Sequence, residues 1–203
     1  MTADSITWIL FDLGNVLVDY KPEALSVVAD FLGVATEDLC TFFDETNIGD
    51  KLATGRLGPQ EFVDILNERF DASLTQNHIV SWFGPEIHNV YPEIPPLIQS
   101  LKKKYFLGIL SNTFFGHWDY FITTDLAQHF DVLMPSHILG YIKPDIKVYR
   151  EALARMGTVP AEIIFIDDNK DNVDAARVCG IHSFQSTSPQ ATISGLKQFG
   201  IVF

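Results

Sequence analysis

Short, uninterrupted apolar runs recur along the chain, and segments with helical periodicity separate most of them. Continuous apolar runs, unlike alternating ones, are typical of strands that are covered on both faces of a parallel sheet. Strands that alternate with helices indicate right-handed crossovers, so the pattern predicts a three-layer α/β/α sandwich around a central parallel sheet. We expect its strands at residues 6–11, 106–110, 131–134, 163–166 and 181–184.

Helices of this sandwich are indicated by their apolar faces and by start and stop signals. We expect them from Ile94, after Pro144, over residues 172–179 and from Ser188. Residues 20–90 interrupt the alternation, because they contain no convincing strand and instead show helical patterns at 22–32, 37–43, 59–70 and 75–83.

A helical insertion after the first strand predicts a second, small domain above the strand ends, where parallel sheets bind ligands. We therefore expect an α/β core at residues 1–19 and 91–203 and an inserted helical-bundle domain at residues 20–90. A length of 203 residues with 47% hydrophobic residues suits one core with such an insertion.

The net charge of −12 argues against a nucleic-acid partner, because phosphate backbones are bound by clustered Lys and Arg. The two cysteines, Cys40 and Cys179, lie far apart without metal-ligand spacing, which favours a reducing compartment. The N-terminus shows no signal-peptide pattern, and no window approaches the apolar length of a membrane span. We expect a soluble, cytoplasmic protein with no membrane partner, and the oligomeric state, monomer or dimer, stays open.

Polar residues stand where the expected strands end. They are Asp12, then Ser111, Asn112 and Thr113, then Asp167 and Asp168 with Asn172 beyond them, and Lys143 in the loop before a helix. Because the carboxyl ends of parallel strands share one edge, these groups should converge around one crevice. Taken alone, Asp12 would be a turn residue and Lys143 a surface lysine. Their coincidence at strand ends favours a site.

Each of these groups has a chemical use. Neighbouring carboxylates raise one another's pKa unless a hard cation lies between them, and Mg²⁺ takes such oxygen ligands. A carboxylate can also attack phosphorus, while an ammonium and a hydroxyl hold the phosphoryl oxygens. The set predicts metal-assisted phosphoryl transfer.

Four segments in this order resemble the ordered motifs of the haloacid dehalogenase-like (HAD) hydrolase superfamily. They are FDLGNVL at 11–17, LSNT at 110–113, KPD at 143–145, and IDDN at 166–169 followed by Asn172. The resemblance covers nearly the whole chain and is strongest to the phosphatase branch. It implies a Rossmann-type α/β fold in which residues 20–90 form the family's small α-helical cap.

Carried over by position, the resemblance implies a role for each residue. Asp12 would be the nucleophile and a Mg²⁺ ligand, and Lys143 would balance charge on Asp12 and on the phosphate. Ser111 would bind the phosphoryl group, with the backbone amides of Asn112 and Thr113 nearby. The remaining metal contacts would come from the Gly14 carbonyl and from Asp168, with Asp167 beside it. We favour Asp168 over Asp167 for direct contact because Asn172 follows Asp168 at helical spacing.

Gly14 departs from the family's pattern, since its phosphatases usually carry there a second aspartate as general acid and base. General acid–base help is worth roughly 10²–10⁴-fold. We therefore expect a substrate with a good leaving group, such as a sugar 1-phosphate or an acyl phosphate, or one that supplies its own proton. The resemblance agrees with this, because members with a DLGNV motif include sugar-phosphate phosphatases.

These observations predict a Mg²⁺-dependent phosphatase of small phosphorylated metabolites that works through an aspartyl phosphate. One alternative is a 2-haloacid dehalogenase-type hydrolase on the same fold, which the acidic pair disfavours. The other is a protein that binds phosphorylated ligands or turns over slowly, because Gly14 leaves hydrolysis without its base. From the helical segment, Asn47, Lys51 and Arg56 are candidates for contact with the substrate.

Overall fold

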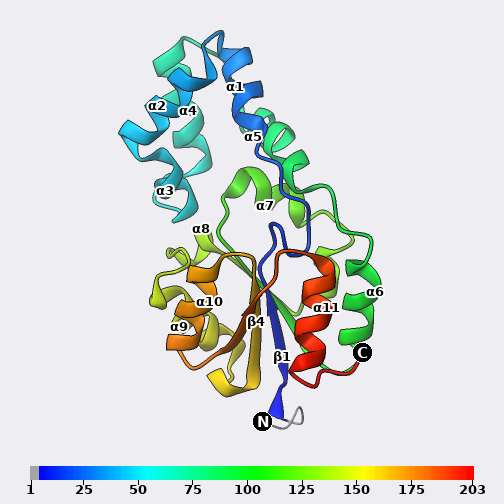
Figure 1. Ribbon diagram of the computed structural model, residues 1–203. Coiled ribbons are helices and arrows are strands. Elements are labelled where there is room, and N and C mark those ends of the chain that lie inside the picture. The colour runs from blue at the N-terminus through cyan, green and yellow to red at the C-terminus, as the bar shows by residue number, and fades with distance from the viewer. Residues whose placement is uncertain (1–4) are drawn as a thin grey trace.

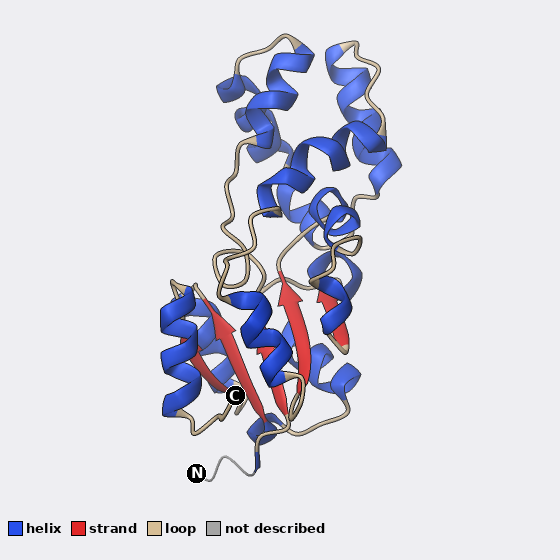
Figure 2. Ribbon diagram, turned by 90° about the vertical axis from the view of Figure 1, so that its right-hand side faces the viewer, coloured by secondary structure: helices blue, strands red, loops and turns tan. Residues whose placement is uncertain are grey.

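A computed structural model describes residues 5–203. Residues 1–4 belong to the expected core and to the segment examined for a signal peptide, and they lie outside the described residues. Five strands form one sheet in the order β3-β2-β1-β4-β5, and every neighbouring pair is parallel. The strands are β1 (Trp8–Phe11), β2 (Phe106–Ser111), β3 (Val132–Pro135), β4 (Ile163–Asp167) and β5 (His182–Gln185). Figure 2 shows the parallel sheet with its arrowheads directed toward a cluster of helices. The prediction of a central parallel sheet is confirmed.

Helices cover both faces of this sheet, which makes the predicted three-layer sandwich. α6 (Ile94–Leu101) and α11 (Pro189–Gln198) lie on one side, and α9 (Ile146–Met156) and α10 (Lys170–Val178) lie on the other (Figure 1). Side chains alternate along β1, so Ile9 and Phe11 pack in the apolar cluster with α6, whereas Leu10 packs in the cluster with α9. Because β1 is buried on both faces, its sequence is a continuous apolar run.

A separate group of helices stands above the carboxyl ends of the strands (Figures 1 and 2). It consists of α1 (Ala24–Leu32), α2 (Thr36–Thr46), α3 (Ile48–Ala53), α4 (Pro59–Phe70) and α5 (Gln76–Phe83), followed by the 3₁₀ helix η2 (Gly84–Ile87). These helices have an apolar core of their own, to which α7 (Phe115–Phe121) adds Phe115. We refer to α1–α5 as the helical unit.

Two connections join the helical unit to the sheet, and they run side by side. Val18 and Val90 form a bridge, the Asp19 amide donates to the Asn89 carbonyl at 2.8 Å, and the Tyr91 amide donates to the Leu17 carbonyl. This pairing anchors the helical unit directly above β1.

Short elements are the main departures from the sequence-based expectations. α3, α7 and α8 (Ser136–Leu139), and the 3₁₀ turns η3 (Ala127–His129) and η4 (Pro160–Glu162), were not expected. The helix expected directly after Pro144 begins at Ile146 instead, because the Asp145 side chain caps it by accepting from the Lys147 amide. Within residues 5–203, no helix combines the length and the hydrophobicity needed to cross a membrane.

Candidate active site

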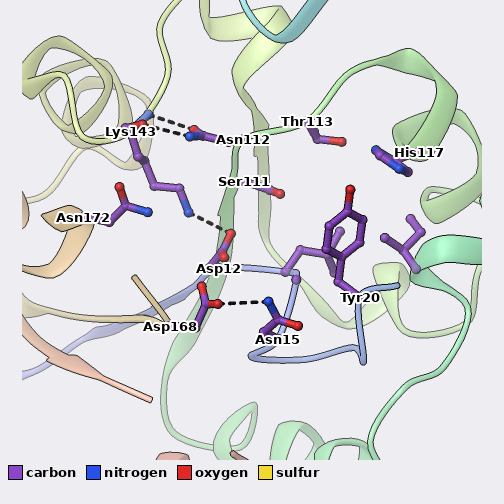
Figure 3. A pocket seen from close by; sticks show the side chains of 13 residues that line it. Asp12, Asn15, Tyr20, Ser111, Asn112, Thr113, His117, Lys143, Asp168 and Asn172 are labelled. Atoms are coloured by element: carbon purple, nitrogen blue, oxygen red, sulfur yellow. Dashed lines mark hydrogen bonds and ion pairs between the residues drawn. The ribbon is translucent and has the colours of Figure 1, made fainter. Parts of the chain in front are cut away.

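The sheet register places the polar residues of three strands at one edge. Phe11 pairs with Ile109 on one side and with Ile166 on the other, so Asp12 and Asp167 leave their strands at the same level. Ser111 is the last residue of β2. The strand ends that the sequence singles out therefore meet around one position, as Figure 3 shows for Asp12 and Ser111.

Lys143 links two of the carboxylates. Its Nζ donates to Oδ1 of Asp12 and to Oδ2 of Asp167, each at 2.7 Å, and its side chain is only 1% exposed. Burial disfavours the ammonium form, but the charges of Asp12 and Asp167 outweigh burial and raise the pKa of Lys143. Lys143 thus stays charged at neutral pH.

The carboxylates outnumber the ammonium. One oxygen each of Asp12, Asp167 and Asp168 lie within 4.8 Å of one another, so full ionisation would leave an excess of negative charge beside Lys143. Burial raises the pKa of Asp12 from its ordinary value of 3.8 to about 6, with Lys143 opposing the rise and Asp167 adding to it. An all-oxygen cluster with excess negative charge has the donor chemistry of a site for a hard divalent cation.

The two acids of the pair have different surroundings. Asp167 is fully buried, and both of its oxygens accept from Nδ2 of Asn172, at 3.0 and 3.1 Å, besides accepting from Lys143 and the Asn169 amide. The position of Asn172 therefore lends no support to the preference for Asp168 as the direct metal contact, because Asn172 donates to Asp167. Asp168 lies on the wall of the pocket and accepts from Nδ2 of Asn15 at 3.0 Å, so it keeps more free acceptor capacity than Asp167.

Asn112 holds the loop that carries Lys143. Its Nδ2 donates to the Lys143 carbonyl and its Oδ1 accepts from the Lys143 amide, both at 2.8 Å. Figure 3 shows the two bonds side by side. The side chain of Asn112 thus connects the end of β2 to the loop before α9 and positions the lysine.

The amides expected to face a phosphoryl group differ in availability. The Thr113 amide donates to Oγ of Ser136 at 2.9 Å, so it is already engaged within the protein. No described residue accepts from the Asn112 amide. The hydroxyl of Ser111 points into the pocket in Figure 3, and the Thr113 side chain also lines it.

These groups surround one cavity of about 200 Å³. It is lined by Asp12, Gly14, Ser111, Asn112, Thr113, Lys143 and Asp168 among others, so of the proposed site residues only the fully buried Asp167 lies behind its wall. No described residue donates to the Gly14 carbonyl.

Three further polar residues line this cavity and were not assigned a role from the sequence, namely His117, Tyr20 and Asn15. His117 lies on its wall beside Tyr20 (Figure 3), and its Nε2 is bonded at 2.7 Å to Oε2 of Glu86, which is buried in η2. Asn15, the third, adopts a left-handed φ of 57° in the turn after β1 and contacts Asp168. Asparagine after glycine is a turn signal, but nothing in the spacing connects His117 to Glu86, which lies 31 positions away.

The three residues of the helical unit that were expected to contact the substrate, Asn47, Lys51 and Arg56, line neither this cavity of about 200 Å³ nor the cavity next to it. The neighbouring cavity is instead lined from α3 by Gly49, Asp50, Leu52 and Ala53.

Comparison with known families decides the assignment. The model of the haloacid dehalogenase-like hydrolases matches residues 6–180. The chain belongs to this family. The resemblance indicated by the four motifs is confirmed, and the chain has the HAD-like fold.

Individual relatives show how far the likeness extends. A structure described as a "predicted HAD-like family hydrolase" from Porphyromonas gingivalis is 27% identical, with a TM-score of 0.82 over 98% of this chain and 100% of that one. A HAD family enzyme from Bacteroides thetaiotaomicron, in complex with magnesium and inorganic phosphate, has a TM-score of 0.74 at 22% identity over 89% and 93% of the two chains. Sesquiterpene phosphatase astK from Aspergillus oryzae is 26% identical over 93% of this chain and 94% of its own length. The chain spans only 13 to 34% of the length of three mouse and rat relatives.

Proposed function

We propose that this HAD-like hydrolase is a Mg²⁺-dependent phosphatase of small phosphorylated metabolites, with Asp12 as the nucleophile. The observation that carries the proposal is the position of Asp12, which is bonded to Lys143 and lies within 4.8 Å of both acids of the pair. Relatives named as phosphatases and a neighbour of the same fold bound to magnesium and phosphate support it. We propose no nucleic-acid or membrane partner and a cytoplasmic location.

The site's own residues fit a magnesium ion. The donors are all oxygens, and three carboxylates surround the single ammonium of Lys143, so full ionisation leaves room for added positive charge. Asp12, Asp168 and the Gly14 carbonyl would hold the ion, while Asp167 is committed to Lys143 and Asn172. When bound, Mg²⁺ would offset the negative charge of the phosphoryl oxygens as they approach Asp12.

In the first step, a carboxylate oxygen of Asp12 forms a bond to phosphorus as the bond from phosphorus to the alcohol oxygen breaks. Lys143 keeps Asp12 ionised and stands beside the incoming phosphoryl oxygens. Ser111 and the Asn112 amide donate to those oxygens. The departing alcohol needs a proton, which Gly14 cannot give.

We assign this proton transfer to His117. Glu86 bonds Nε2 and orients the ring, so Nδ1 is the nitrogen left for the pocket. The imidazolium gives its proton to the alcohol oxygen. The neutral ring then takes a proton from the water that attacks phosphorus, and the bond to Asp12 breaks, which releases phosphate and restores both residues.

The helical unit completes the site. It stands over the strand ends, and its residues line the cavity next to the catalytic one. We propose that residues 20–90 act as a cap, which excludes bulk water from the phosphoaspartate and selects the alcohol part of the substrate.

Phosphate release from a panel of phosphorylated metabolites tests the proposal, with and without Mg²⁺. We expect release from wild type only with Mg²⁺, and a loss of about 10³-fold or more in Asp12→Asn. Halide release from 2-haloacids in EDTA would instead support a dehalogenase. Tight Mg²⁺-dependent binding of phosphorylated ligands without release would support a binding protein.

A further inference from the structure

A second cavity opens beside the catalytic one. Its volume is about 370 Å³, and its lining comes both from the helical unit and from the loops after the strands. The two cavities share Tyr20, Asn112, Thr113 and His117 on their walls. A phosphate ester bound at Asp12 would therefore extend its alcohol part past Tyr20 and His117 into this second cavity.

The wall of the second cavity is apolar away from the shared residues. Four phenylalanines line it, namely Phe43, Phe62, Phe83 and Phe114, and three aliphatic side chains join them, namely Leu25, Leu52 and Ile142. Among the described lining residues that the catalytic cavity does not share, Asp50 alone has a polar side chain, and it is exposed at the surface.

Such a wall discriminates between alcohols. A sugar would lose the hydration of several hydroxyls and find few partners there, and an unpaired buried hydroxyl is costly. An alkyl or isoprenoid chain would gain from contact with the phenylalanines, by about three- to fourfold in binding for each methylene removed from water.

We infer that the substrate is the phosphate monoester of an apolar alcohol rather than of a sugar. This inference rests on the proposed phosphatase function and narrows it. It departs from the expectation of a sugar 1-phosphate, which followed from Gly14 and from the resemblance to sugar-phosphate phosphatases, because His117 supplies the proton that a poor leaving group requires.

A series of n-alkyl monophosphates, from methyl to octyl, tests the inference beside glucose 1-phosphate. We expect kcat/KM to rise about three- to fourfold per methylene until the cavity is filled, and hexyl phosphate to exceed glucose 1-phosphate by at least tenfold. A flat series, or glucose 1-phosphate as the better substrate, overturns the inference while leaving the phosphatase function intact. No phosphate release from any ester, methyl phosphate included, overturns both.

Two substitutions at one position distinguish the effect of a charged side chain in the second cavity from the effect of a larger side chain. Ala53 lines the second cavity from the end of α3 and does not belong to the buried core of the helical unit. Ala53→Leu and Ala53→Asp place side chains with the same number of non-hydrogen atoms and the same branch point there, one apolar and one charged. We expect the ratio of kcat/KM for hexyl phosphate to that for methyl phosphate to be at least tenfold lower in Ala53→Asp than in Ala53→Leu. Equal losses in two variants that unfold at wild-type temperature would contradict an apolar site.

Discussion

Gly14 stands where the phosphatases that this chain resembles usually place a second aspartate. A Cβ built on Gly14 would lie 3.5 Å from Cβ of Tyr20, an ordinary contact, so the position accepts a side chain without backbone strain. Proton transfer by an aspartate at position 14, as in the family, can therefore be compared with proton transfer by His117 within one protein.

Replacing His117 tests the proposed acid and base. His117→Gln should lower kcat for alkyl phosphates about 10²–10⁴-fold, because no group then protonates the alkoxide. Aryl and acyl phosphates, whose leaving groups need little protonation, should lose far less. Steady-state kinetics on both classes measure the difference.

The double variant Gly14→Asp with His117→Gln is the control for that loss. It should recover at least tenfold of the lost activity on alkyl phosphates, because a carboxyl group returns at the family's position. Equal losses on all leaving groups, with no recovery, would assign His117 a structural role.

The position of some site residues could be predicted from the sequence, whereas the contacts of others could not. Asp12, Ser111 and the acidic pair follow apolar runs, so their meeting at one edge is a consequence of parallel topology. The contact between Asn172 and Asp167 could not be predicted, because the spacing of four to Asp168 does not show that Asp167 faces back into the core. The bond between His117 and Glu86 depends on how η2 packs on α7, which no local pattern encodes.

At the level of elements, the end of β2 and the loop before α9 work together through Asn112. An equivalent arrangement occurs in the helical unit, where the side chain of Asn67 donates to the Leu74 carbonyl and accepts from the Leu74 amide. The two asparagines make the same pair of bonds in different places, which provides a matched comparison.

Asn112→Ala and Asn67→Ala should each lower the free energy of unfolding by about 1–3 kcal/mol, because each loses two hydrogen bonds to the backbone. Only Asn112→Ala should lower kcat/KM, by about tenfold or more, since it releases the loop of Lys143. Urea denaturation and kinetics on both variants check this. Similar activity in the two variants would mean that Asn112 does not position the lysine.

The strands and the longer helices could be predicted because their apolar patterns extend over several residues. α3 has 6 residues, α7 has 7 and α8 has 4, which is too short for a periodic signal. α7 matters most, since it carries His117 and packs under the helical unit.

At the scale of the whole molecule, the site contributes to stability through its charge balance. The folded protein holds a proton on Asp12 up to about pH 6, whereas an unfolded aspartate loses it near 3.8. The folded state therefore binds more protons between these values, and stability falls as the pH rises through this window. A difference of about 2 pKa units corresponds to roughly 3 kcal/mol.

Asp12→Asn removes this titration without a change in size. In EDTA, the variant should be more stable than wild type at pH 7, by up to about 3 kcal/mol, and the difference should shrink toward pH 4. Mg²⁺ should stabilise wild type at pH 7 more than the variant. Chemical denaturation at both pH values measures the free energy of unfolding of the two proteins. A stability difference between them that does not depend on pH would contradict the charge imbalance.

The expected position of the helical unit above the sheet rests on where the chain leaves its first strand, which the sequence pattern indicates. The apolar second cavity could not be predicted, because its wall combines side chains from α1, α3, α5 and the loop after β2.

Trapping the covalent intermediate tests the central role of Asp12 most directly. Wild type mixed with Mg²⁺ and an excess of hexyl phosphate, quenched in acid during turnover and mapped by peptide mass spectrometry, should carry a phosphoryl group on Asp12. Asp12→Asn treated in the same way should carry none. A phosphoryl group on another residue, or phosphate release that persists at the wild-type rate in Asp12→Asn, would contradict the account.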